Sequence, residues 1–144
     1  MAITTNAIAS SFKKELLEGK HDFTASTGSA FKLAMYNSNA VLGKSTTSYT
    51  TGSEVSSPAG YSAGGKALVN TGTSVSSSVA ITTFGNLSFT NVTLTARGSL
   101  IYNTSNSNSA VAVLDFGSDK TATAGTFTIQ FPAYTTSAAI LRIS

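Results

Sequence analysis

Residues 60–66 come close to a phosphate-binding loop. Gly60, Gly65 and Lys66 fit its pattern of a glycine, four further residues, a second glycine and a lysine. Such a loop also needs a Ser or Thr after the lysine to hold Mg²⁺, and a following helix whose N-terminus faces the phosphates. Here Ala67 follows, and the next residues are β-branched and interrupted by glycine. We therefore interpret residues 60–66 as a glycine-rich turn between two strands, and we expect no nucleotide or other cofactor.

The remaining polar side chains do not suggest a catalytic set. His21 is the only histidine, and on an extended chain its neighbour Asp22 would point the opposite way. Asp115 and Asp119 flank a predicted turn, where they would either bind a cation or only make turn hydrogen bonds. There is no cysteine, which excludes thiolate nucleophiles and thiolate zinc sites. We expect a protein that is not an enzyme.

Composition favours an all-β domain with uncharged faces. Only 10% of the 144 residues are charged, whereas 23 are serine and 22 are threonine. Threonine favours strands, and both residues favour turns. The nine basic side chains are scattered along the chain, so we expect no nucleic-acid partner. No apolar run approaches the roughly 20 residues of a membrane span, and the first residues do not resemble a secretion signal.

One helix is predicted near the start, over residues 6–18. Thr5 or Asn6 would be its N-cap, and Gly19 would end it. Its apolar positions recur every four residues, at Ile8, Phe12 and Leu16. A helix this short is marginal alone, so we expect the stripe to dock on the same domain or on a neighbouring subunit.

From residue 20 onward, short β-patterned segments alternate with turn signals. Strands are expected at residues 30–36, 67–70, 79–84, 87–89, 92–102, 110–116, 126–131 and 138–144, with a bulge at Gly98 and loops at 41–61 and 117–125. This pattern is typical of a β-sandwich or flattened barrel of seven to eight short antiparallel strands. We predict two parts: residues 1–19, an N-terminal arm and amphipathic helix, and residues 20–144, a single β-sandwich domain.

Three tyrosines lie in polar segments, where they would contact a partner protein or a sugar, or be ordinary exposed or half-buried tyrosines: Tyr49, Tyr61 and Tyr134. We favour Tyr49 and Tyr61 as contact residues. Together with Ile8, Phe12 and Leu16 they are our predicted partner-binding residues.

Five blocks of the sequence look familiar in this order: MAITTNAIASSFKKELLEGKHDF, AFKLAMYNSNAVLG, EVSSPAGYSAGGKALVN, TARGSLIYN and AVAVLDFGSDKTATAGTFTIQFP. Along nearly the whole chain they resemble a family of small structural proteins of tailed bacteriophages. The resemblance implies a virion component, assembled in the bacterial cytoplasm. A capsid decoration (cement) protein is favoured, which would bind the major capsid protein and copies of itself, as a homotrimer or another small oligomer. The alternative is a tail or head-fibre component that binds a glycan or receptor of the host.

Overall fold

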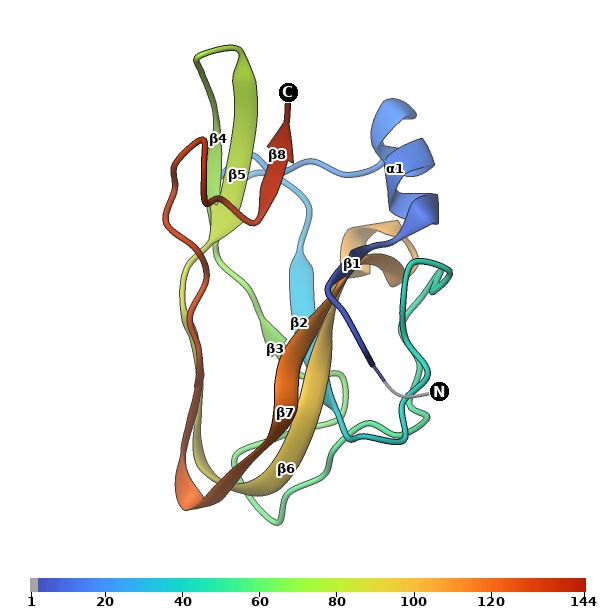
Figure 1. Ribbon diagram of the computed structural model, residues 1–144, viewed down its shortest axis with the longest axis vertical. Helices are drawn as coiled ribbons and strands as arrows, with labels where there is room; N and C mark the ends of the chain where they lie inside the picture. The colour runs from blue at the N-terminus through green and yellow to red at the C-terminus, as the bar shows by residue number, and fades with distance from the viewer. Residues whose placement is uncertain (1–2) are drawn as a thin grey trace.

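The computed structural model describes residues 3–144 and consists of two antiparallel sheets and one short helix (Figure 1). The larger sheet has the strand order β1-β7-β6-β2-β3, and the smaller sheet has the order β4-β5-β8. The strands are β1 (Ala7–Ile8), β2 (Phe31–Tyr36), β3 (Lys66–Ala67), β4 (Asn70–Ser76), β5 (Val79–Phe84), β6 (Leu87–Asn103), β7 (Ser109–Ile129) and β8 (Leu141–Ile143); the helix is α1 (Ser10–Leu17), and η1 (Thr104–Asn106) is a 3-10 turn. The predicted all-β fold with one N-terminal helix is confirmed.

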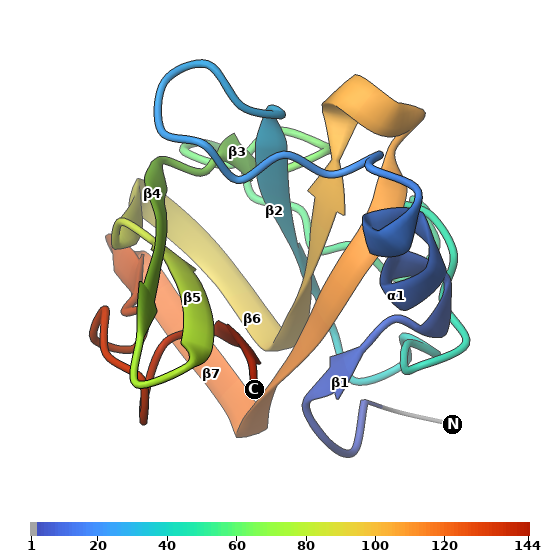
Figure 2. The same ribbon diagram turned by 90° about the horizontal axis from the view of Figure 1, so that it is seen from above.

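One long hairpin, formed by β6 and β7, organises the molecule. The two strands have 17 and 21 residues, so the predicted loop at 117–125 is wrong: β7 continues through it while pairing with β6. Gly117 takes a left-handed φ of +80°, and the pairing shifts register between Ala96 and Gly98, where a bulge was predicted. Bulges bend a strand without ending it. Seen from above, the hairpin therefore forms a V (Figure 2).

The helix begins later than predicted. It starts at residue 10 rather than 6, because the preceding residues pair with β7 as the short strand β1. Neither Thr5 nor Asn6 is its N-cap; that position is Ala9, which makes no side-chain cap bond. The Asn6 side-chain oxygen instead accepts a hydrogen bond from a backbone N–H of β7. Gly19 follows the helix in the left-handed region, as expected of a terminating glycine.

The N-terminal segment belongs to the core of the β-domain. Ile3 is fully buried and Phe12 is 3% exposed. Phe12 packs in a chain of aromatic rings, with centroids 4.6–6.0 Å apart, that continues through Phe23, Phe31 and Phe84. These contacts argue against residues 1–19 as a separable arm, although Met1 and Ala2 lie outside the described residues.

Candidate interaction groove

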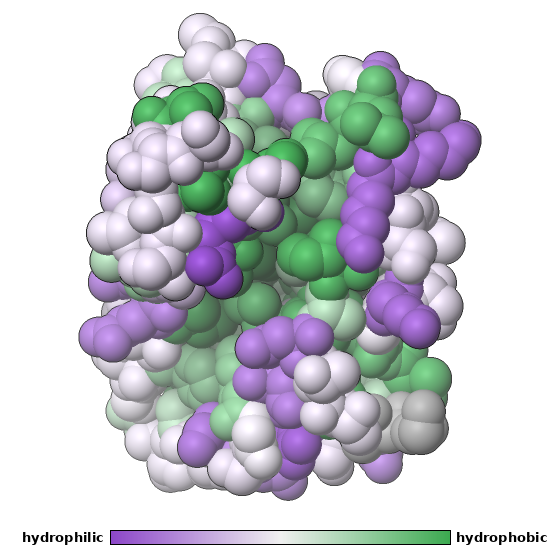
Figure 3. All heavy atoms as spheres, turned by 45° about the horizontal axis from the view of Figure 1, so that its top comes forward, coloured by the Kyte–Doolittle hydropathy of each residue, from purple (hydrophilic) through white to green (hydrophobic). Residues whose placement is uncertain are grey.

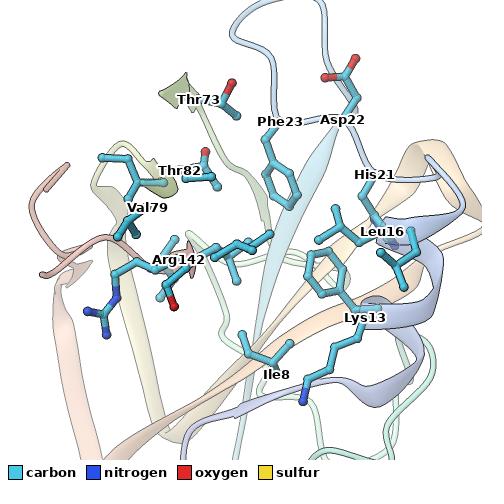
Figure 4. Close-up of a pocket in the computed structure, with 18 of the residues that line it drawn as sticks. Ile8, Lys13, Leu16, His21, Asp22, Phe23, Thr73, Val79, Thr82 and Arg142 are labelled. Carbon is cyan, nitrogen blue, oxygen red and sulfur yellow. The ribbon is translucent and has the colours of Figure 1, made fainter. Parts of the chain in front are cut away.

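An apolar groove separates α1 from the smaller sheet. It has a volume of about 1300 Å³, and the space-filling view shows apolar surface along its floor and walls (Figure 3). One wall carries the three side chains of the predicted helix stripe, although only Phe12 and Leu16 lie on α1 and Ile8 lies on β1. The facing wall is formed by β5 and β8, and Figure 4 shows side chains from both walls pointing into the space between them.

The helix wall is held in place by a buried histidine. The His21 side chain is fully buried; its Nε2 lies 2.7 Å from Glu15 Oε2, and its Nδ1 lies 2.9 Å from Asn103 Nδ2. The Asn103 side-chain oxygen accepts from the Ser105 backbone N–H, so its amide nitrogen faces the ring and donates to Nδ1. It follows that Nε2 carries the proton and donates to Glu15. Both ring nitrogens are thus used to fix α1 to the turn between β6 and β7.

The mouth of the groove exposes large apolar side chains from both walls. Leu17, in the last turn of α1, is 91% exposed, and Ile143 of β8 is 57% exposed. Ile8 and Leu16 are only half-buried behind them. An exposed apolar side chain is ordinary when isolated, but a contiguous patch in a hollow marks a binding surface.

The charged side chains along the groove are mainly basic. Lys13 lies on the helix side of the groove, whereas Arg142 alternates with Leu141 and Ile143 on β8 and its guanidinium is turned away from the groove (Figure 4). Within residues 3–144 neither forms a salt bridge. Arg142 donates instead to the backbone carbonyls of Thr136 and Ser137. The single acidic side chain of the lining is Asp22, and hydrogen bonds from the Thr24 side chain and backbone lower its pKa.

Tyr49 and Tyr61, two of the predicted partner-binding residues, lie outside the groove. Tyr61 is only 9% exposed, and Tyr49 is half-buried. Both hydroxyls donate to the Glu54 carboxylate, over 2.6 Å from Tyr49 and 2.7 Å from Tyr61. Burial first, and Glu54 next, raise the pKa of both tyrosines far above its usual value. Their hydroxyl groups are therefore used in hydrogen bonds within the protein.

The glycine-rich turn at residues 60–66, which resembled a phosphate-binding loop, binds a negatively charged group. That group is the Glu54 carboxylate of the same chain. The Gly64 backbone N–H donates to Glu54 Oε1 over 2.7 Å. Residues 60–66 form a turn that leads into β3, and no named strand lies between β2 and this turn, in agreement with the loop expected at residues 41–61. The role of Glu54 was not predicted from the sequence because its partners lie five residues before it and seven and ten residues after it.

The two aspartates considered for a cation are not arranged as a metal site. Asp115 Oδ1 accepts from the Gly117 backbone N–H at 2.8 Å and from Arg97 Nε at 3.2 Å. Asp119 is exposed. Residues 3–144 contain no group of three or more potential metal ligands. For Asp115 the turn hydrogen bond is the observed alternative, with the Gly117 backbone N–H as donor.

Comparison with known proteins found no matching family model, no matching curated protein and no matching solved structure. Over residues 3–144, no helix has both the length and the apolar character needed to cross a membrane.

The facing wall of the groove was missed by sequence reasoning. Residues 138–144 were predicted only as a last strand. Apolar residues at Ile140, Leu141 and Ile143 break the alternation of a strand with one wet face. That break was the available signal that this strand has apolar surroundings on more than one side.

Proposed function

We propose that this protein is a structural component of a tailed-phage virion, a capsid decoration protein that binds the major capsid protein through the groove. The observation that carries the proposal is the open apolar groove with Leu17 and Ile143 exposed at its mouth. Such a surface is characteristic of a protein that associates with another macromolecule. The virion context comes from the sequence resemblance.

Local chemistry supports binding in preference to catalysis. The His21 ring is occupied on both nitrogens, and the Glu54 carboxylate accepts three hydrogen bonds from its own chain. A general base must instead present a free acceptor to its substrate. A decoration protein needs only modest affinity at each contact, because many copies or several contacts per copy supply avidity.

The alternative, a glycan-binding tail or head-fibre component, is less well supported by the positions of the two tyrosines. It rested on Tyr49 and Tyr61 as exposed contact residues. Their hydroxyls are engaged with Glu54, and Tyr61 is buried. The groove, with its apolar walls, suits a protein segment better than a sugar.

Co-sedimentation with phage heads tests the proposal. Heads stripped of this protein are mixed with the full chain or with variants Leu17→Asp and Ile143→Asp, and the bound fraction is measured. Both side chains are exposed, so the variants should fold normally by circular dichroism while binding falls about tenfold or more. Val75→Asp is the matched control, because Val75 is 72% exposed but lies outside the groove.

Two results would contradict the proposal. If the full chain fails to bind heads, or if both groove variants bind like the control, the groove is not a capsid interface. Immunogold labelling of intact particles gives an independent check. Label over the heads agrees with decoration, whereas label confined to tails contradicts it and favours a tail component.

A further inference from the structure

We propose that His21 is a proton-sensitive latch, which ties the second half of α1 to the turn between β6 and β7 only while its ring is neutral. Its side chain is fully buried and lies at the helix wall of the groove (Figure 4). The proposal goes beyond the function proposed above, because no step of it involves the groove's partner. Three observations carry it: the tautomer of the ring, the orientation of Asn103, and the separate attachment of the first half of α1.

The ring has one nitrogen that could still take up a proton, and that nitrogen already accepts a hydrogen bond. Nε2 donates to Glu15 Oε2 over 2.7 Å, whereas Nδ1 accepts from the Asn103 amide over 2.9 Å. A protonated imidazole donates from both nitrogens. Protonation at Nδ1 would therefore point an N–H at the N–H of Asn103, and the contact would become a repulsion between two donors.

Asn103 cannot turn over to accept this proton without a loss elsewhere. Its side-chain oxygen accepts from the Ser105 backbone N–H over 2.9 Å, and its amide nitrogen also lies 3.4 Å from the Lys20 carbonyl. Asn103 is completely buried, and the rings of Phe12 and Phe31 lie beside the imidazole with centroids 4.7 and 6.4 Å away. A buried donor without an acceptor costs free energy, so the proton is better held by a ring that has moved away from Asn103.

The charged neighbours strengthen the contact of the ring with the helix, not its contact with the turn. Within residues 3–144, Glu15 is the one charged side chain that hydrogen-bonds the ring, and a carboxylate favours a protonated imidazole. The groups of β2 and β6 that contact the ring carry no charge. The nearby charges of Glu18, Lys14 and Lys20 are paired with one another over 2.9 Å, and the Asp22 carboxylate accepts hydrogen bonds from its own loop. On protonation the ring should therefore stay with α1 and leave β6.

The two halves of α1 are attached differently, which makes the latch observable. The first half is tied to β7 and to residues 41–45 by the backbone N–H groups of Ala9 and Ser10. The polar ties of the second half run through the Glu15 carboxylate, to His21 and to η1. A form in which Nδ1 is free binds a proton more readily than the latched form, so acid favours it. We therefore expect the second half of α1 to open locally as the pH falls.

Amide hydrogen exchange of the full chain, followed residue by residue by NMR, tests the latch. Protection factors, corrected for the intrinsic effect of acid on exchange, are compared between about pH 7.5 and about pH 5.5, where histidines ordinarily change charge. The amides of Glu18, Gly19 and Lys20 close the end of the helix and should lose about tenfold or more of their protection. The Lys13 amide, which donates to the Ala9 carbonyl, is the internal control and should keep its protection.

Three variants identify the proton. Asn103→Asp offers a carboxylate that accepts from a protonated Nδ1, so protection should no longer depend on pH in this range. His21→Gln cannot take up a proton there and should behave likewise. Glu15→Gln keeps an acceptor for Nε2 but removes the neighbouring carboxylate, so acid should still lower the protection. In the unmodified protein, the nitrogen chemical shifts of the ring report directly whether Nε2 carries the proton at neutral pH.

The proposal is overturned if protection at residues 18–20 does not fall, or falls no more than at Lys13. It is also overturned if the pH response persists in Asn103→Asp, or disappears in Glu15→Gln, which would make Glu15 the group that titrates. A neutral ring with its proton on Nδ1 contradicts it as well. If His21→Gln does not fold, Asn103→Asp and the ring shifts decide. Failure of the protein to bind phage heads leaves the latch untouched, so the two proposals fail separately.

Discussion

Removing the Glu54 carboxylate should destabilise the protein more than any other change of a single acidic side chain. Its oxygens accept hydrogen bonds from Tyr49, Tyr61 and the Gly64 backbone, over 2.6, 2.7 and 2.7 Å. The Tyr61 hydroxyl also accepts from the Met35 backbone N–H in β2. Glu54 thus ties the long loop after β2 to the glycine-rich turn and to the larger sheet.

The magnitude follows from these contacts. A hydrogen bond to a charged group contributes about 1.5–3 kcal/mol, and an unsatisfied buried donor costs about 1–3 kcal/mol. Glu54→Ala leaves three donors without their acceptor, but Tyr49 is half-buried and can turn to water. We therefore expect a loss of about 3–5 kcal/mol in the free energy of unfolding. Glu54→Gln keeps one acceptor oxygen, so about 1–2 kcal/mol is expected.

Urea unfolding followed by near-ultraviolet circular dichroism of the tyrosines is the assay. A double-mutant cycle with Tyr61→Phe should give a coupling energy of about 1–2 kcal/mol, because the two residues share one hydrogen bond in a part-buried setting. Asp119→Ala is the control, since this carboxylate is exposed and should matter by less than about 0.5 kcal/mol. The reasoning is refuted if Glu54→Ala costs no more than the control, or if the cycle is additive.

Three further changes test other parts of the structure. The raised pKa of Tyr61 means that the unfolded state loses its proton first, so stability should be intact below about pH 10 and fall above it; tyrosinate absorbance during alkaline unfolding measures this. Gly65→Ala should cost at least about 2 kcal/mol in thermal melts, because φ is +78° and the new methyl group would overlap the Leu33 carbonyl; Gly19→Ala, at φ +72° with nothing nearby, should cost only about 1 kcal/mol. Deleting residues 1–19 removes β1 and the buried Phe12, so circular dichroism should show an unfolded chain; a sharp melt of the truncated domain would restore the separable arm.

The features that sequence reasoning predicted are local ones. The strand predicted at residues 30–36 is β2, and Phe31, Leu33 and Met35 are buried in it. The bulge at Gly98 and the helix end at Gly19 follow from what glycine allows in a strand and after a helix. In each case neighbouring residues carry the information.

The errors arise where a distant segment decides the local structure. Residues 117–125 contain glycine, serine and aspartate and look like a loop, yet β6 supplies partners for Lys120, Thr121, Ala122 and Gly125. The start of the helix was misplaced because Ala7 and Ile8 pair with β7. Local preference is weak compared with a sheet edge that offers backbone hydrogen bonds and a core to cover.

The groove shows the same limit at the level of function. One wall comes from residues 8–17 and the other from β5 and β8, so the sequence displays the apolar residues but not that they lie close together. The helix stripe was expected to dock either on its own domain or on a neighbour, and the structure divides it. Phe12 is in the core, Ile8 and Leu16 are half-buried, and Leu17 is almost fully exposed beside them. The inner half of the stripe is therefore satisfied within the chain, and only the outer half needs a partner. For this reason Leu17→Asp separates folding from partner binding: binding should fall while the domain stays folded. A change at Phe12 would alter folding and binding together.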